Sequence, residues 1–143
     1  TGFNPAYLGS SATYTDLIHK LGKKAMDGLY ATHTVQHPYM DEVSPKIAFW
    51  AKKYQTKFGD DPTVFSVYGY QVIDLFIQIA DKTGPKLTVD TFINTLEGFS
   101  STRDMFGADA MSFSRAKHLG SNRARLSQIV NGKWTPITDY ITE

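Results

Sequence analysis

Histidines are the side chains of this chain with the clearest potential for chemistry, because cysteine is absent. His33 and His37 stand four positions apart, a spacing that would place both imidazoles on one face of a helix and suit a zinc ion. The stretch between them reads as extended chain that ends before Pro38, so the spacing loses that meaning. Asp41 and Glu42 would add oxygen ligands, but a solvated loop explains these residues more simply.

Signatures of other catalysts and of cofactor sites are absent from the sequence. It contains no Gly-x-Gly-x-x-Gly, no phosphate loop and no Gly-x-Ser-x-Gly elbow. The run 60–62, Asp-Asp-Pro, is typical of a turn that ends a helix rather than of a catalytic carboxylate pair. No cofactor is expected. A small hydrolase or metalloenzyme that uses His33, His37 and Asp41 remains an alternative, which metal analysis of the purified protein would test.

Two other groups of residues suit the binding of a small molecule. Ser10 and Ser11 follow Gly9 and precede an expected helix, where hydroxyls and free backbone N–H groups can hold a carboxylate. Ordinary helix capping is the competing interpretation. Tyr68 and Tyr70 lie near the start of a long apolar helix, and each combines an apolar ring with a hydroxyl group. For these tyrosines the competing interpretation is core packing.

The elements that would position these residues follow the order β-α-β, three helices and a terminal hairpin, which indicates an α/β fold. Asn131-Gly132 between two extended runs is the strongest local signal, since both central residues of a type I′ turn need positive φ. The first expected elements are a strand within 3–8, a helix capped by Thr13 or Thr15, and a strand at 29–35. The core face of that helix would carry Leu17, Ile18, Leu21 and Ala25. Helices at 45–58, 68–84 and 88–96, a strand at 110–113 and a hairpin at 126–137 are expected to follow. Within the helix at 88–96, Val89, Phe92, Ile93 and Leu96 are expected to point inward.

The helix expected at 68–84 is apolar nearly all round, with few polar interruptions. A surface helix carries one apolar stripe, whereas a helix that is apolar on most faces lies inside a layered core. The remainder of the chain offers little material to cover it. We therefore expect an exposed apolar patch, and association through it with an absent part of the same protein or with a second copy.

Bulk composition excludes several classes of protein. The 143 residues suggest one domain, and the net charge of +1 provides no basic surface for nucleic acid. No apolar run approaches the roughly 18 residues of a membrane span. The chain starts at Thr1 without a methionine or signal peptide, from which we expect that upstream sequence is missing.

In order and spacing, these segments resemble a known family. AYLGSSATYTDLIHKLGKKAMDGLYAT is similar to the strand, small-residue loop, helix and crossing strand of type I periplasmic binding proteins. PKIAFWAKKYQTKFGDDPTVFSVYGYQVIDLFIQIADKTG resembles the helical core of the branched-chain amino-acid (Leu/Ile/Val-binding-like) substrate-binding proteins of ABC transporters. LTVDTFINTLEG, FGADAMSFSRAKHLG and LSQIVNGKWTPI resemble the following helix, the return segment and the terminal hairpin. Each motif is loose, but their order is specific.

The resemblance implies the C-terminal part of a two-lobed fold of the Venus-flytrap type, in which the lobes close on a solute. Residues 1–35 would be a β-α-β piece and crossing strand of the second lobe. Residues 36–105 would be helices of the first lobe, and residues 106–143 the return segment and terminal hairpin. On this interpretation the chain is a fragment of a longer protein.

The resemblance also implies a site. Ser10 and Ser11 match the loop that lines the cleft from the second lobe, and Tyr70 matches an aromatic position on the first-lobe side, with Tyr68 its neighbour. Branched-chain amino-acid binders usually carry an acidic residue in that loop to meet the ligand ammonium, and residues 9–14 contain none. A carboxylate, such as an aliphatic or aromatic acid, is therefore expected to fit better than a zwitterionic amino acid.

The function implied is solute capture for an ABC importer, with a membrane permease as partner and no catalysis. The expected location is the periplasm, or the cell exterior as a membrane-anchored lipoprotein. A ligand-sensing regulatory module of the same fold is the main alternative, and a permease gene beside this one would distinguish the two.

Overall fold

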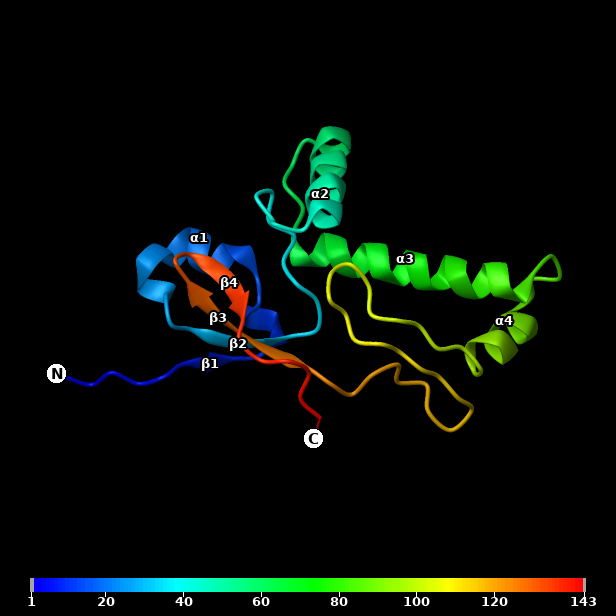
Figure 1. The fold of residues 1–143 in the computed structure, drawn as a ribbon. Helices are drawn as coiled ribbons and strands as arrows, with labels where there is room; N and C mark the ends of the chain where they lie inside the picture. Colours follow the sequence, from blue (N-terminus) through cyan, green and yellow to red (C-terminus); the bar gives the residue numbers. More distant parts are fainter. Residues whose placement is uncertain (1, 143) are drawn as a thin grey trace.

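The computed structural model describes residues 2–142, which form two parts joined by long connections (Figure 1). The sheet body contains β1 (Leu8–Gly9), η1 (Ser11–Thr13), α1 (Asp16–Gly22), η2 (Lys23–Met26), β2 (Tyr30–His33), β3 (Arg125–Val130) and β4 (Lys133–Pro136). The helical body contains α2 (Pro45–Phe58), α3 (Val64–Thr83) and α4 (Val89–Leu96). This arrangement confirms the expected α/β class.

The four strands form one mixed sheet in the order β1-β2-β3-β4. β1 and β2 run parallel, with Leu8 opposite Tyr30, and the crossover between them carries α1, as parallel pairing requires. β2 and β3 run antiparallel although the whole helical body separates them in sequence. The helical body is therefore an insertion between two neighbouring strands.

The terminal hairpin has the turn that its sequence predicts. Asn131 and Gly132 have φ values of 52° and 75°, as the central residues of a type I′ turn require. This turn sets the register of β3 and β4, in which Val130 faces Lys133.

Local signals also place the three long helices. α2 begins at Pro45 and ends at Gly59, whose φ of 85° suits a glycine after a helix. Thr88 caps α4, with its side chain accepting from the Thr91 N–H at 3.2 Å. α3 begins earlier than expected, at Val64, because the turn of helix before Tyr68 carries no residue that breaks it.

The prediction for the inner face of α1 is right for Ile18, which packs against the core, and wrong for Leu17 and Leu21. Leu17 and Leu21 are 58% and 81% exposed, whereas Asp16 and His19 are buried. This short helix turns Asp16 and His19 toward the segment that follows β2, where the His19 ring lies edge-on to His37 with centroids 6.5 Å apart. Asp16 also pairs with Lys20 of the same helix at 2.5 Å. An ion pair and aromatic neighbours thus replace the apolar contacts that the pattern predicted.

Two further expectations in the helical body and return segment are corrected. Val89 and Ile93 of α4 are exposed, whereas Phe92 points to α3 and stacks on Phe76 with ring centroids 5.2 Å apart. Residues 110–113 form no strand. Ser112 makes only an isolated bridge to Ser100.

The core lies where the two bodies meet. It combines Tyr14, Ala31, Val35, Ile129 and Trp134 with Ile47, Val64, Val67, Phe106 and Ala108. The outer side of α3, in contrast, leaves Phe65, Val72, Ile73, Phe76 and Ile77 exposed within residues 2–142. The apolar helix therefore lacks part of its cover, as its sequence indicates. Among the described helices, none has the length and apolarity that a membrane crossing demands.

Candidate functional site

The loop after β1 presents two hydroxyl groups to solvent. Ser10 and Ser11 are both exposed, and Ser10 precedes η1 without a side-chain capping bond. Two backbone bonds hold the turn: the Thr13 N–H donates to Ser10 O at 2.9 Å and the Tyr14 N–H to Ser11 O at 3.2 Å. A Cβ at Gly9 would lie 2.4 Å from the Thr13 hydroxyl oxygen, so this tight loop requires glycine there. The two serine hydroxyls are thus available to a ligand.

Tyr14 fixes this loop to the core. Its ring stacks on His33 at 4.6 Å and lies 5.1 Å from the Trp134 ring. Its hydroxyl accepts a hydrogen bond from the His37 N–H at 3.0 Å. Burial raises the pKa of Tyr14 to about 12, and the nearby hydroxyl of Tyr68 adds to the rise. Tyr14 therefore remains protonated at physiological pH and links both serines to the inner side of α3.

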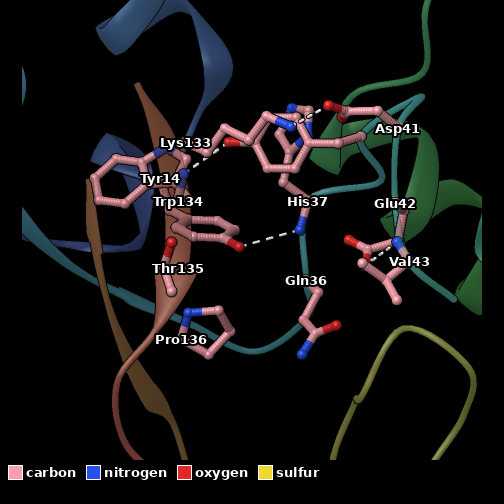
Figure 2. A pocket seen from close by; sticks show the side chains of 11 residues that line it. Tyr14, Gln36, His37, Asp41, Glu42, Val43, Lys133, Trp134, Thr135 and Pro136 are labelled. Carbon is pink, nitrogen blue, oxygen red and sulfur yellow. Dashed lines mark hydrogen bonds and ion pairs between the residues drawn. The ribbon is translucent and has the colours of Figure 1, made fainter. Parts of the chain in front are cut away.

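Next to Tyr14, a cavity of about 380 Å³ lies between segment 36–43 and β4 (Figure 2). Tyr39 closes one wall, where its hydroxyl oxygen accepts from the backbone N–H of Trp134 at 2.7 Å. At the rim, the Lys133 ammonium pairs with the Asp41 carboxylate. Polar groups thus line the cavity, and Glu42 adds a second carboxylate, which accepts from the Val43 N–H at 2.8 Å.

The histidines of this region are not part of a solvated loop. His33 is fully buried and His37 is 5% exposed, because the rings of Tyr14 and Tyr39 pack against them. Desolvation lowers the pKa of His37 to about 4, although the Asp16 carboxylate, 3.8 Å from its Nε2, acts in the opposite direction. Within residues 2–142, no three histidine, aspartate or glutamate side chains are arranged to hold a metal ion.

The two tyrosines of α3 lie in different surroundings. Residues two positions apart on an α-helix point about 200° apart. Tyr68 is half-buried and packs on the core near Tyr14. Tyr70 is 38% exposed, and its ring meets Trp50 and Phe106 edge-on, each at 5.7 Å. Desolvation, Asp74 and Asp104 raise the pKa of Tyr70.

Tyr14 thus fixes the serine loop to the core against which Tyr68 packs, and Tyr70 meets Trp50 and Phe106 at another part of the same core. Sequence reasoning missed Tyr14, His37, Tyr39 and Trp134 as neighbours. The available signal was the apolar run Pro38-Tyr39-Met40 directly after His37, since such residues tend to be buried.

A family model identifies the family of this chain, and solved structures share its fold. A family model described as periplasmic binding protein matches residues 1–133. Comparison with curated protein sequences finds no match. A branched-chain amino acid ABC transporter protein from Thermus thermophilus with bound valine superposes with a TM-score of 0.75 at 18% identity, over 99% of this chain and 40% of that one.

Two further solved structures share the fold. A fatty acid ABC transporter substrate-binding protein from Thermomonospora curvata gives a TM-score of 0.74 at 18% identity, over 99% of this chain and 38% of that one. A solute binding protein of an ABC transporter from Rhodopseudomonas palustris was solved in complex with 3,4-dihydroxy benzoic acid. It gives a TM-score of 0.70 at 20% identity, over 94% of this chain and 36% of that one. At such identities the likeness concerns the fold alone.

The chain thus spans about 40% of the length of the Thermus thermophilus structure and a similar share of the others. The matched fold is a mixed α/β sheet with flanking helices, which agrees with a partial copy of the two-lobed architecture. Since the family model covers residues 1–133, this chain belongs to the periplasmic binding protein family.

Proposed function

We propose that this chain is part of the solute-binding component of an ABC importer, which captures a small organic solute between two lobes and delivers it to a membrane permease. Family membership and the transporter proteins among the structural neighbours support this function. The protein would act without catalysis, in the periplasm or as a lipoprotein anchored at the cell surface.

In this proposal, the rest of the fold comes from an N-terminal part of the same protein. Residues 1–35 then belong to the second lobe, residues 36–105 to the first lobe, and residues 106–143 return to the second lobe and form the hairpin. The exposed apolar side of α3 would be covered by that N-terminal part. Closure favoured by the solute requires contacts that are stronger in the closed form.

The composition of the serine loop supports a carboxylate as the solute. Ser10 and Ser11 offer exposed hydroxyls, and residues 9–14 contain no acidic side chain to meet an ammonium group. The nearest carboxylate in the sequence, Asp16, is buried and already paired with Lys20. An organic or aromatic acid, held by hydroxyl donors, therefore suits this loop better than a zwitterion does.

Opposite this loop, the proposed contacts are Tyr68 and Tyr70 of α3. Tyr68 packs against the core cluster that contains Tyr14, and Tyr14 directly follows the serine loop, which supports Tyr68 as a contact. Tyr70 would reach the solute only at the edge of its cluster with Trp50. Tyr68 is accordingly proposed as the main aromatic contact.

Calorimetry of the full-length protein tests this function with 3,4-dihydroxybenzoate, a straight-chain fatty acid and valine. We expect one of the acids to bind and valine not to bind. Ser11→Ala should then weaken binding about 10- to 100-fold, as expected for a hydrogen bond to a charged group. Ser112→Ala, a change at an exposed serine of the return segment, is the control. Tight valine binding, or full affinity in Ser11→Ala, would contradict the proposal.

A further inference from the structure

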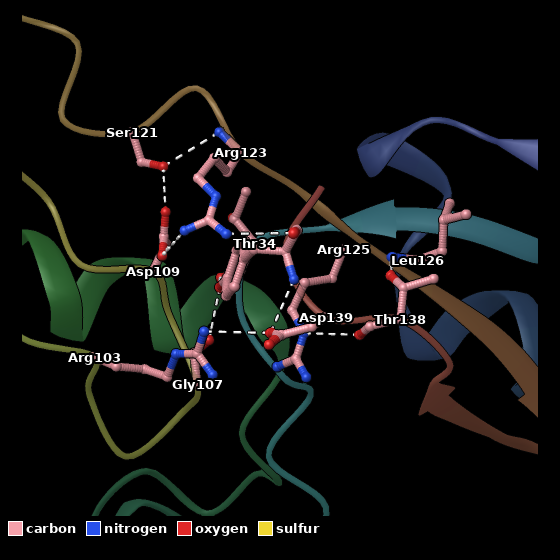
Figure 3. A network of polar contacts seen from close by, with 11 residues as sticks. Thr34, Arg103, Gly107, Asp109, Ser121, Arg123, Arg125, Leu126, Thr138 and Asp139 are labelled. Carbon is pink, nitrogen blue, oxygen red and sulfur yellow. Dashed lines mark hydrogen bonds and ion pairs between the residues drawn. The ribbon is translucent and has the colours of Figure 1, made fainter. Parts of the chain in front are cut away.

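Three stretches of chain meet at one buried side chain, Tyr140. Figure 3 shows one residue of each stretch, Thr34, Gly107 and Asp139, in the same polar network. Tyr140 is 8% exposed and lies in the C-terminal segment after β4. Its hydroxyl lies 2.8 Å from the carbonyl oxygen of Thr34, in the connection that leaves β2. It also lies 2.6 Å from the carbonyl oxygen of Gly107, in the segment that returns from the helical body. One hydroxyl thus bridges both connections between the two bodies.

The C-terminal segment is itself fixed to the sheet body. Ile141 and Ala124 exchange backbone hydrogen bonds of 2.8 and 3.3 Å, just before β3. The Leu126 N–H donates to the Thr138 hydroxyl oxygen at 2.9 Å, and Arg125 Nε donates to the Thr138 carbonyl at 3.2 Å. Tyr140 is therefore held by the sheet body on both sides of its own position.

The return turn, residues 104–108, is fixed to the helical body in the same way. The Asp104 carboxylate accepts from the N–H groups of Phe106 and Ala108, each at 2.9 Å. Its second oxygen accepts from Gln71 Nε2 of α3 at 2.6 Å. The Gln36 N–H donates to Phe106 O at 2.9 Å and adds a second bond between the two connections. A continuous series of polar contacts thus runs from α3 through the return turn to Tyr140.

Three guanidinium groups surround the Tyr140 ring. Arg103, Arg123 and Arg125 lie 5.1, 5.5 and 5.3 Å from its centroid, within the range of cation–π attraction. Asp109 and Asp139 orient two of them, since each accepts an arginine N–H at 3.2 to 3.3 Å. These contacts keep the ring in place.

The hydroxyl of Tyr140 is a hydrogen-bond donor under physiological conditions. Burial raises its pKa to about 12, although the neighbouring Arg125 acts in the opposite direction. The two carbonyl oxygens that it meets are acceptors only, so they need this proton. The hydroxyl has a single proton, which the two carbonyl oxygens share, and removing it would take away that common donor at a cost in free energy.

We propose that Tyr140 is a positioning residue for motion between the sheet body and the helical body, because its hydroxyl joins the two connections at Thr34 and Gly107 into one pivot. Together with the Gln36–Phe106 bond, Tyr140 would make the two connections move as one unit instead of independently. That this motion closes a cleft rests on the function proposed above. The pivot itself rests on the contacts of Tyr140.

The test compares Tyr140→Phe with Tyr54→Phe in the full-length protein without solute. Tyr140→Phe keeps the ring and removes the hydroxyl, and Tyr54 packs on Trp50 and Phe58 in α2, away from the pivot. Spin labels on Lys24→Cys and Lys53→Cys report the distance between η2 and α2. We expect Tyr140→Phe to broaden the distance distribution, and the Gln36 amide to exchange with deuterium about tenfold faster. Tyr54→Phe should leave both readouts unchanged.

An unchanged distribution and exchange rate in Tyr140→Phe, or equal changes in Tyr54→Phe, would overturn the pivot. If Tyr140→Phe does not fold, Gln71→Ala provides the test, because it frees the same turn from α3. In that variant, a broader distribution of distances between the spin labels supports the pivot, and an unchanged distribution overturns it. Both readouts are recorded without solute, so a protein that binds no acid would refute the proposed function and leave this result standing.

Discussion

Acidification is expected to destabilise the protein through His37. The side chain is buried beside Tyr39, with neither ring nitrogen hydrogen-bonded to another described residue. Desolvation, the largest cause, lowers the pKa of His37 to about 4 from an ordinary value of 6.5. Asp16 opposes this shift, while His19 and Lys20 reinforce it.

The sign and size of the effect follow from proton binding. In this pH range the unfolded chain binds a proton at His37 below about pH 6.5 and the folded chain does not, so the free energy of unfolding falls as the pH falls. The fall continues until the pH reaches the folded pKa of about 4. At about 1.4 kcal/mol per pKa unit, the contribution of His37 is about 3 kcal/mol. Asp16, whose pKa is lowered, loses its own contribution only at lower pH.

Urea unfolding of the full-length protein at pH 7 and at pH 4, followed by tryptophan fluorescence, measures this difference. His37→Gln should reduce the pH-dependent loss by about 3 kcal/mol. The part of the pH-dependent loss that is due to His19 and His33 should remain, because burial also lowers the pKa values of these histidines. His118→Gln, at an exposed histidine that contacts Glu97 at 3.2 Å, is the control and should change the pH dependence by less than about 1 kcal/mol, as expected for a surface pair. A His37→Gln protein with the full wild-type pH dependence would refute the reasoning.

Two further predictions concern the return turn and α3. Asp104→Ala removes the three hydrogen bonds that its carboxylate accepts from Phe106, Ala108 and Gln71. It should therefore lower the free energy of unfolding by about 2–4 kcal/mol in urea titrations. A loss below the error of the titration would contradict the role of Asp104 in holding the return turn. The 143-residue chain alone should self-associate in sedimentation experiments, and Ile73→Lys, on the exposed side of α3, should shift it toward monomer. A compact monomer at all concentrations would show that the apolar side needs no cover.

The sequence was most informative where one or two residues determine the backbone. Pro45 and Gly59 bound α2, and Asn131-Gly132 defines the hairpin turn, because these residues restrict or permit particular φ values. Such signals are local, so they remain valid whatever the chain packs against. The α/β class and the order of the elements follow from them.

Predictions failed where burial depends on distant partners. α1 has only seven residues, and its inner face is determined by segment 36–43 and by β4. From β4, the indole N–H of Trp134 donates to the backbone carbonyl of Thr15 at 2.9 Å. The burial of His37 has the same origin, because Tyr14 covers it from another element. No periodicity within a short helix or loop reports such neighbours.

Some features of the candidate site were predictable from local sequence, and others depend on distant partners. The exposed serine loop was predictable, since Gly9 and two serines favour a tight polar turn. The separation of Tyr68 from Tyr70 also follows from helical geometry, although the two were expected to act as neighbours. The role of Tyr14 as their link to the serines was not predictable, because it depends on the packing of the two bodies.

The insertion of the helical body between β2 and β3 has a consequence for biosynthesis. Tyr30 pairs with Gln128, so the sheet cannot be completed until nearly all of this chain has left the ribosome. Contacts between residues so far apart in sequence slow folding, since a long loop must close before they form. α2 and α3 can form earlier from local contacts. A nascent chain that stops before residue 125 would leave Tyr14 without Trp134, and would expose the edge of β2 to pairing with other chains.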